Sequence, residues 1–199
     1  MSHSLKGKTV AILVTDGFEQ AEFTEPKKAL EAAGAKTVVV SPNRGEVQAW
    51  KHYEKGEMFP VDRELSKADA GEFDALLLPG GVANPDQLRM NEEAVDFVRA
   101  FAAEGKPIAA ICHGPWTLVE AGVVAGRTMT SWPSIKTDLI NAGAKWVDRD
   151  VVADHGLVTS RKPDDIPAFN KKMIEEFAAG KHAPRLAPVA RPHWGEANA

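Results

Sequence analysis

Short apolar runs of strand length alternate with segments of helical spacing along most of the chain. The runs are "KTVAILV", "KTVVVS", "DALLLP" and "KPIAAI", and the helical segments include "EPKKALEAAGAK", "NEEAVDFVRAFAAEGK" and "PWTLVEAG". A continuous apolar run indicates a strand buried on both faces, because a half-exposed strand would alternate with polar residues. The alternation therefore predicts a doubly wound α/β fold, with helices on both faces of a mostly parallel sheet.

Two stretches depart from this alternation. Residues 43–65 are polar and interrupted, which predicts a small antiparallel excursion or a lid. Residues 181–199 are rich in proline and lack periodicity, so we expect an extended C-terminal tail after a single domain spanning residues 1–180. The stretch "WVDRDVVADHGLVTSR" predicts a hairpin that turns at His155 and Gly156.

Composition and net charge limit the cellular location and the binding partners that we expect. The formal net charge is −4, which gives no electrostatic reason to expect nucleic acid as the main partner. No run approaches the roughly 18 consecutive apolar residues of a membrane helix, so no membrane association is expected. The chain has one cysteine, which cannot form an internal disulfide and fits a cytoplasmic location.

That single cysteine, Cys112, stands between a predicted strand and a predicted helix. The strand ends at Ile111 and the helix begins near Pro115, which leaves few residues for the turn. The positions Ala110, Cys112 and Gly114 match the G-x-S-x-G spacing of a nucleophile elbow. The helix N-terminus favours a thiolate, so we expect a lowered pKa and a reactive cysteine rather than a small buried hydrophobe.

Five segments together resemble the PfpI/ThiJ family of the class I glutamine amidotransferase-like superfamily. They are "AICHGP", "LLLPGGVANPDQLR", "TDGFEQAEFTEP", "TSWPSIKTDLINAGAKWVD" and "LVTSRKPDDIPAF". The resemblance covers residues 8–177 and is close to the intracellular-protease, general-stress and deglycase branch. It implies a flavodoxin-like α/β fold and a cofactor-free cysteine hydrolase. The substrates it implies are peptides, glyoxal- or methylglyoxal-modified proteins and nucleotides, or methylglyoxal itself.

The resemblance also implies roles around the nucleophile Cys112. Glu19 is expected to lie under the sulfur and to hydrogen-bond it in protonated form, because two adjacent charges are disfavoured. The neighbouring Glu22 is expected to face its helix or solvent. The amides of Gly81 and His113 would form an oxyanion hole. Gly80 and Gly114 are expected with them in the oxyanion and substrate-binding site, where glycine allows the close approach of the backbone.

His113 is the expected base. In the hexameric branch of the family a carboxylate from a neighbouring subunit orients this histidine, and Asp86 is the matching candidate here. The resemblance thus implies a homo-oligomer, a dimer or a hexamer, with a cross-subunit active site. Trp116 is expected to wall the site or to lie at a subunit contact. His155, beside Asp154, is a rival base.

Two other functions remain as alternatives. The first is a redox-sensing or chaperone-like stress protein, whose accessible cysteine is oxidised rather than catalytic. The second, a glutamine amidotransferase subunit, is disfavoured because the C-terminal segment lacks a His-x-Glu pair. The scattered histidines show no metal-ligand spacing, and no glycine-rich nucleotide motif follows a strand, so no metal is expected.

Overall fold

The computed structural model describes residues 3–184, and a sheet of seven strands forms its centre. The strand order is β11-β12-β8-β7-β1-β3-β6, and every neighbouring pair is parallel except β11 with β12. A two-stranded sheet (β9, β10) and a three-stranded sheet (β2, β4, β5) accompany it. The predicted doubly wound α/β fold, with its mostly parallel sheet and its antiparallel excursion, is confirmed.

The elements have the following bounds. The strands are β1 (Thr9–Leu13), β2 (Phe18–Glu19), β3 (Lys36–Ser41), β4 (Glu46–Lys51), β5 (Glu54–Pro60), β6 (Arg63–Glu64), β7 (Ala75–Leu78), β8 (Ile108–Ile111), β9 (Thr128–Met129), β10 (Lys145–Trp146), β11 (Val151–Asp154) and β12 (Leu157–Ser160). The helices are α1 (Gln20–Ala32), α2 (Ala83–Leu88), α3 (Glu92–Ala103), α4 (Pro115–Glu120), α5 (Lys136–Asn141) and α6 (Ile166–Ala179). Short 3-10 turns are Leu65–Lys67, Ala70–Glu72, Pro133–Ile135 and Pro163–Asp165.

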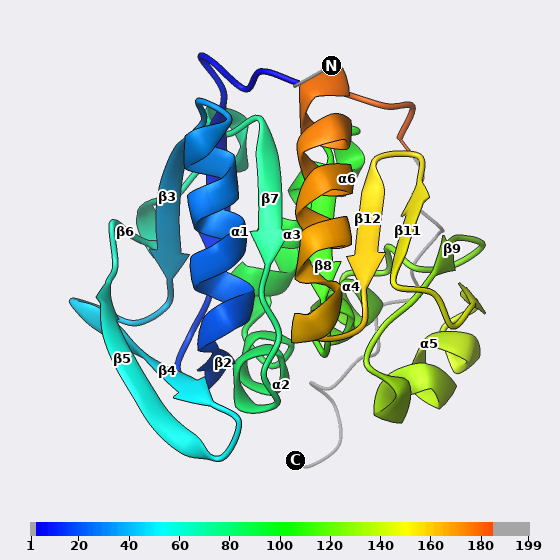
Figure 1. The fold of residues 1–199 in the computed structure, drawn as a ribbon, viewed down its shortest axis with the longest axis horizontal. Helices are drawn as coiled ribbons and strands as arrows, with labels where there is room; N and C mark the ends of the chain where they lie inside the picture. The colour runs from blue at the N-terminus through cyan, green and yellow to red at the C-terminus, as the bar shows by residue number, and fades with distance from the viewer. Residues whose placement is uncertain (1–2, 185–199) are drawn as a thin grey trace, which may run out of the picture.

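Helices cover both faces of the central sheet. α1 and α6 lie side by side in front of it, and α3 lies behind (Figure 1). Alternation along β1 divides its side chains, because successive residues of a strand point to opposite faces. Val10 and Ile12 join the apolar cluster under α1 and α6, whereas Ala11 and Leu13 join the cluster under α3.

The parallel strands place several turns at one edge of the sheet. The arrowheads of β3, β7 and β12 all point toward the lower edge in Figure 1. The segments that follow β1, β7 and β8 therefore meet there, at the usual position of ligand sites in such sheets. The β4–β5 hairpin is held against this edge, because β4 pairs with β2 and the Gln48 N–H donates to Asp16 Oδ1 at 2.7 Å.

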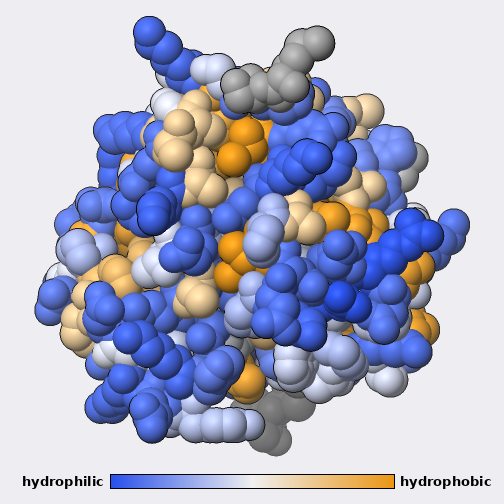
Figure 2. Space-filling view, viewed as in Figure 1, coloured by the Kyte–Doolittle hydropathy of each residue, from blue (hydrophilic) through white to orange (hydrophobic). Residues whose placement is uncertain are grey.

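The surface is mixed rather than uniformly apolar. Figure 2 shows the face over α1 and α6 as mostly hydrophilic, with separate small hydrophobic areas. Within residues 3–184, no helix is long and apolar enough to span a membrane. The predicted tail begins inside the described part, where the His182 N–H donates to the Gly105 carbonyl oxygen at 2.7 Å. Residues 185–199 of that predicted tail lie outside the described residues.

Candidate active site

Cys112 occupies a strained turn between β8 and α4. Its φ is 61°, in the left-handed region that non-glycine residues seldom adopt and that clusters at functional sites. The turn is tight, since a Cβ on Gly114 would lie 2.6 Å from the Leu78 carbonyl oxygen. The Gly114 N–H donates to the Ile111 carbonyl oxygen at 2.9 Å, so this amide closes the elbow and is not directed at a substrate.

The carboxyl group beside the sulfur belongs to Glu22, and the prediction of Glu19 in that position is wrong. Glu22 is fully buried in the first turn of α1, and its carboxyl is hydrogen-bonded with the Cys112 thiol. Glu19 instead accepts the His52 N–H at 3.0 Å and holds the turn of the β4–β5 hairpin. The start of the helix explains the difference. Helix α1 begins at Gln20, five residues before Glu25, where the predicted helical segment starts, and this places Glu22 on the buried side of the helix.

Burial, together with the nearby charge of Glu19, raises the pKa of Glu22 to about 8. The carboxyl is therefore protonated at neutral pH. Its Oε2 accepts the Gly80 N–H at 2.9 Å, whereas Oε1 has no hydrogen-bond partner among the described groups. We assign the proton to Oε1, because Oε2 already accepts the Gly80 N–H.

The pKa of Cys112 is raised, which contradicts the expected thiolate. The thiol is 8% exposed, so burial is the main cause, and the charge and hydrogen bond of Glu22 add to it. The backbone N–H groups of His113 and Gly81 face the sulfur and act in the opposite direction. The helix N-terminus does not outweigh the loss of water, so the resting cysteine is a thiol.

The Gly80–Gly81 turn brings its backbone against both the thiol and the carboxyl. A Cβ on Gly80 would lie 2.5 Å from Glu22 Oε2 and 2.6 Å from the Cys112 Cβ. Gly81 has a φ of 74°, and a Cβ there would lie 2.3 Å from the Gly17 carbonyl oxygen. Only glycine fits either position without displacing the backbone or the reactive groups.

His113 contacts the nucleophile within its own chain. Its Nδ1 lies 3.2 Å from Cys112 Sγ, and its Nε2 lies 3.1 Å from Ser134 Oγ. Burial lowers the pKa of His113 to about 4, so the imidazole is neutral at neutral pH. With Nδ1 accepting the thiol hydrogen, Nε2 carries the ring hydrogen and donates it to Ser134.

Two tryptophans enclose the imidazole. The ring centroid of Trp116 lies 5.2 Å from that of His113, and Trp132 stacks at 6.1 Å with an interplanar angle of 26°. Trp116 is itself held by donation of its Nε1–H to Asp138 Oδ2 at 2.7 Å. Trp116 thus lies beside the site, which is one of the two positions predicted for it.

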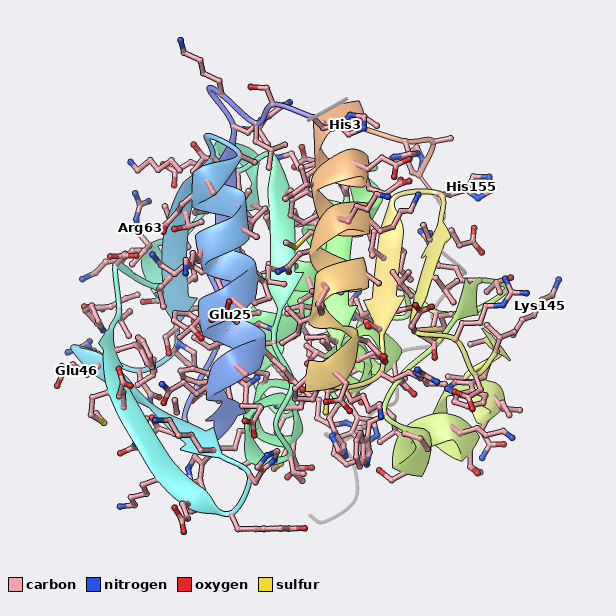
Figure 3. All side chains as sticks on the ribbon, viewed as in Figure 1. His3, Glu25, Glu46, Arg63, Lys145 and His155 are labelled. Carbon is pink, nitrogen blue, oxygen red and sulfur yellow. The ribbon has the colours of Figure 1, made fainter. Side chains whose placement is uncertain are left out.

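Asp86 and His155 do not contact the thiol or the imidazole in this chain. Asp86 is exposed on α2, and its reach to a partner's histidine stays a prediction. His155 lies at the β11–β12 turn, at the upper right of Figure 3, and pairs with Asp154 at 2.6 Å. Because Leu157 pairs with Ile108 at the start of β8, this turn is at the opposite edge of the sheet. The rival-base prediction for His155 is therefore wrong.

Sequence reasoning missed Ser134, Asn84 and the true position of Glu22. Ser134 follows Trp132-Pro133, a turn with no motif of its own, and reaches His113 only through the fold. Asn84 lies in the "GGVANPD" segment, where the signal for it is a polar residue shortly after a glycine turn. Among residues 3–184, no group of three or more His, Cys, Asp or Glu side chains could hold a metal ion.

Comparison with known proteins gives the same fold and names enzymes among the relatives. The chain is 43% identical over 174 residues to "Protein/nucleic acid deglycase 2" of Escherichia coli, covering 86% of this chain and 99% of that protein. It is 43% identical over 169 residues to "General stress protein 18" of Bacillus subtilis, covering 84% and 96% of the two chains. These names support enzymatic activity and a stress role within the family.

A solved structure and a family model agree with these relatives. The crystal structure of Drosophila melanogaster DJ-1beta matches with a TM-score of 0.77 and 32% identity, over 86% of this chain and 90% of that one. The model of the DJ-1/PfpI family matches residues 8–176, which include every residue of the site described above. The chain belongs to the DJ-1/PfpI family.

Proposed function

We propose that this protein is a cysteine hydrolase for small carbonyl adducts, with Cys112 as nucleophile and His113 as base. One observation carries the proposal. The Cys112 thiol lies 3.2 Å from a neutral imidazole nitrogen, while two backbone N–H groups face its sulfur. The relative named as a deglycase supports this reaction class.

The first step is addition of the thiol to a carbonyl carbon. The Sγ–C bond forms as the thiol proton moves to His113 Nδ1, and the carbonyl π electrons move to oxygen. The resulting oxyanion is stabilised by the N–H groups of Gly81 and His113, a type of contact worth about 3–4 kcal/mol per donor. The Glu22 carboxyl is protonated below about pH 8, so it adds no negative charge beside the sulfur.

For an adduct, the amine or thiol leaves before this addition: its bond to the carbinol carbon breaks, the hydroxyl electrons form the aldehyde C=O, and the hydroxyl proton passes to the departing nitrogen or sulfur. Addition of Cys112 to the aldehyde carbon, with return of the proton on His113 Nδ1 to the oxyanion, gives a hemithioacetal. The C–H proton of that carbon then passes by way of His113 to the neighbouring ketone carbon, while the hydroxyl proton moves to the ketone oxygen and the carbon bonded to sulfur becomes C=O. A thioester remains on Cys112. Water then adds to the thioester carbon with His113 accepting its proton, and collapse of that adduct frees a carboxylic acid and returns the thiol.

The burial of the thiol favours small substrates. Only 8% of Cys112 is exposed, and Trp132 and Trp116 flank the adjacent imidazole. A side chain of a folded protein would have to present its carbonyl past both rings, whereas a small adduct needs no such reach. The raised pKa of Cys112 also weakens the redox-sensor alternative, because peroxide reacts with the thiolate.

A substrate panel tests the proposal. It contains methylglyoxal, methylglyoxal adducts of N-acetylcysteine and of guanosine, and a fluorogenic peptide. We expect the adducts to be turned over faster than the peptide. Since Cys112 is the only cysteine, iodoacetamide should abolish activity in proportion to the label, reaching zero at one label per chain.

The same panel also distinguishes the proposed function from its competitors. Turnover of the peptide alone would replace the adduct hydrolase with a peptidase. Absence of turnover on every substrate, combined with selective addition of oxygen to Cys112 by mild peroxide, would favour the redox-sensing protein. Activity that survives complete alkylation would overturn the cysteine mechanism itself.

A further inference from the structure

A buried amide lies next to the Gly80–Gly81 turn. Asn84 is fully buried in the first turn of α2, and its Nδ2 donates to the carbonyl oxygens of Pro79 at 3.0 Å and Gly80 at 3.1 Å. Its Oδ1 accepts the Thr15 N–H at 2.8 Å. Because a backbone N–H requires an acceptor, the Thr15 contact establishes which end of the amide is oxygen. The NH₂ end therefore faces the two carbonyls.

The contact with the Gly80 carbonyl determines where the next N–H points. The Gly80 C=O and the Gly81 N–H belong to one planar trans peptide, in which the two bonds point in opposite directions. With the carbonyl oriented toward Asn84, the Gly81 N–H points away from it. That N–H is the one that faces the Cys112 sulfur.

This peptide needs such an anchor. It joins two glycines, so no Cβ on either side restricts its rotation, and a flip would exchange the positions of its C=O and N–H. The flipped form would direct a carbonyl oxygen at the sulfur and would remove a donor from the oxyanion position. An NH₂ group opposite the Gly80 oxygen stabilises only the unflipped form.

We propose that Asn84 is a positioning residue that holds the Gly80–Gly81 peptide with the Gly81 N–H directed at the reacting centre. Asn84 itself touches neither the thiol nor the substrate. The inference rests on the proposed function for its catalytic consequence, but its geometric content can be measured on the cysteine without any substrate.

The substitution Asn84→Asp tests this orientation directly. Its shape is nearly unchanged, and one oxygen still accepts the Thr15 N–H. The other oxygen would face two carbonyl oxygens and would accept the Gly81 N–H of a flipped peptide. We expect kcat to fall about a hundred- to a thousandfold with little change in KM, as loss of one oxyanion donor does.

A second readout follows the sulfur itself. The Gly81 N–H favours the thiolate, so its loss should move the pH midpoint of iodoacetamide alkylation of Cys112 upward. The side chains of Glu22 and His113, which face the sulfur, are kept in the variant. The Gly81 N–H also hydrogen-bonds the Glu22 carboxyl, so its loss should raise the pKa of Glu22 as well. Asn84→Ser, which adds no charge and is too short to reach both carbonyls, should shift the midpoint in the same direction.

The matched control is Asn91→Ala. Asn91 caps α3 by accepting the Ala94 N–H at 3.0 Å, so its loss lowers the unfolding temperature without touching the site. We expect this control to keep the wild-type alkylation midpoint and kcat. Asn84→Asp and Asn84→Ser proteins that fold and retain both values would overturn the proposal. A shifted midpoint without turnover by the wild type would reject the hydrolase function and retain the role of Asn84.

Discussion

At Cys112 the thiol contacts an imidazole and a carboxyl. The thiol donates to His113 Nδ1, Nε2 donates to Ser134, and the buried Glu22 carboxyl lies against the sulfur. All three groups are uncharged at neutral pH, because burial raises the pKa of Glu22 to about 8 and lowers that of His113 to about 4. The resting site therefore holds a thiol beside the proton acceptor His113, rather than a thiolate.

Glu22→Gln should widen the active pH range on its alkaline side. In the wild type, kcat/KM should fall below pH about 4 as His113 gains a proton, and above about 8 as Glu22 loses one. A glutamine amide mimics the protonated carboxyl at every pH, since it carries no charge and its oxygen can accept the Gly80 N–H. The variant should therefore keep its activity above pH 8 in a pH–rate profile.

Glu19→Gln is the control for this profile. Glu19 accepts the His52 N–H at the hairpin turn, so its substitution should leave both limbs where they are. A displaced alkaline limb in Glu19→Gln, together with a wild-type limb in Glu22→Gln, would return the carboxyl role to Glu19.

Ser134→Ala should lower kcat/KM about tenfold, because the imidazole loses the acceptor that holds its Nε2–H and its ring orientation. Steady-state kinetics with Ser134→Thr as the rescuing variant measure the effect. We expect Asp86→Asn to change kcat/KM less. The reverse order, with Asp86→Asn the more damaging change and the oligomer intact, would assign orientation of His113 to Asp86 of a partner subunit.

At the level of elements, the sequence predicted the strands better than the helix starts. Continuous apolar runs identified β1, β3, β7 and β8, because burial on both faces leaves a clear signal. The start of α1 carried no such signal, since Glu19, its N-cap residue, makes no side-chain cap hydrogen bond. One turn of helix determines whether Glu19 or Glu22 faces the sulfur. The sequence alone therefore does not identify which of the two carboxyl groups lies beside Cys112.

Gly80→Ala should damage both stability and turnover. The new methyl group would meet Glu22 Oε2 at 2.5 Å and the Cys112 Cβ at 2.6 Å, so the reactive groups must separate. We expect a loss of about 1–3 kcal/mol in the free energy of unfolding, measured by urea denaturation, together with a large fall in kcat.

Gly126→Ala provides the matched control for Gly80→Ala. Its Cβ would meet nothing within 4 Å, so its only cost is the left-handed backbone at φ +74°. That cost is about 1 kcal/mol, without an effect on kcat. Equal stability and equal turnover in the two variants would refute the close packing inferred at Gly80.

Over the whole molecule, topology explains why the site could be located before its details were known. Parallel strands bring the turns after β1, β7 and β8 to one edge, so the segments around Glu19, Gly80 and Cys112 had to meet. Ser134 could not be found in this way, because its contact with His113 depends on a 3-10 turn outside the central sheet. Assembly into a dimer or hexamer stays a prediction.

The central claim is that Cys112 forms the bond to the substrate carbon. The most direct measurement is the turnover rate of Cys112→Ser beside that of the wild type, on the best substrate of the panel. The serine hydroxyl fits the same elbow but is a far weaker nucleophile against a neutral imidazole. The account predicts a loss of at least about a thousandfold with an unchanged fold by circular dichroism. Turnover of the serine variant at a rate near that of the wild type would contradict it.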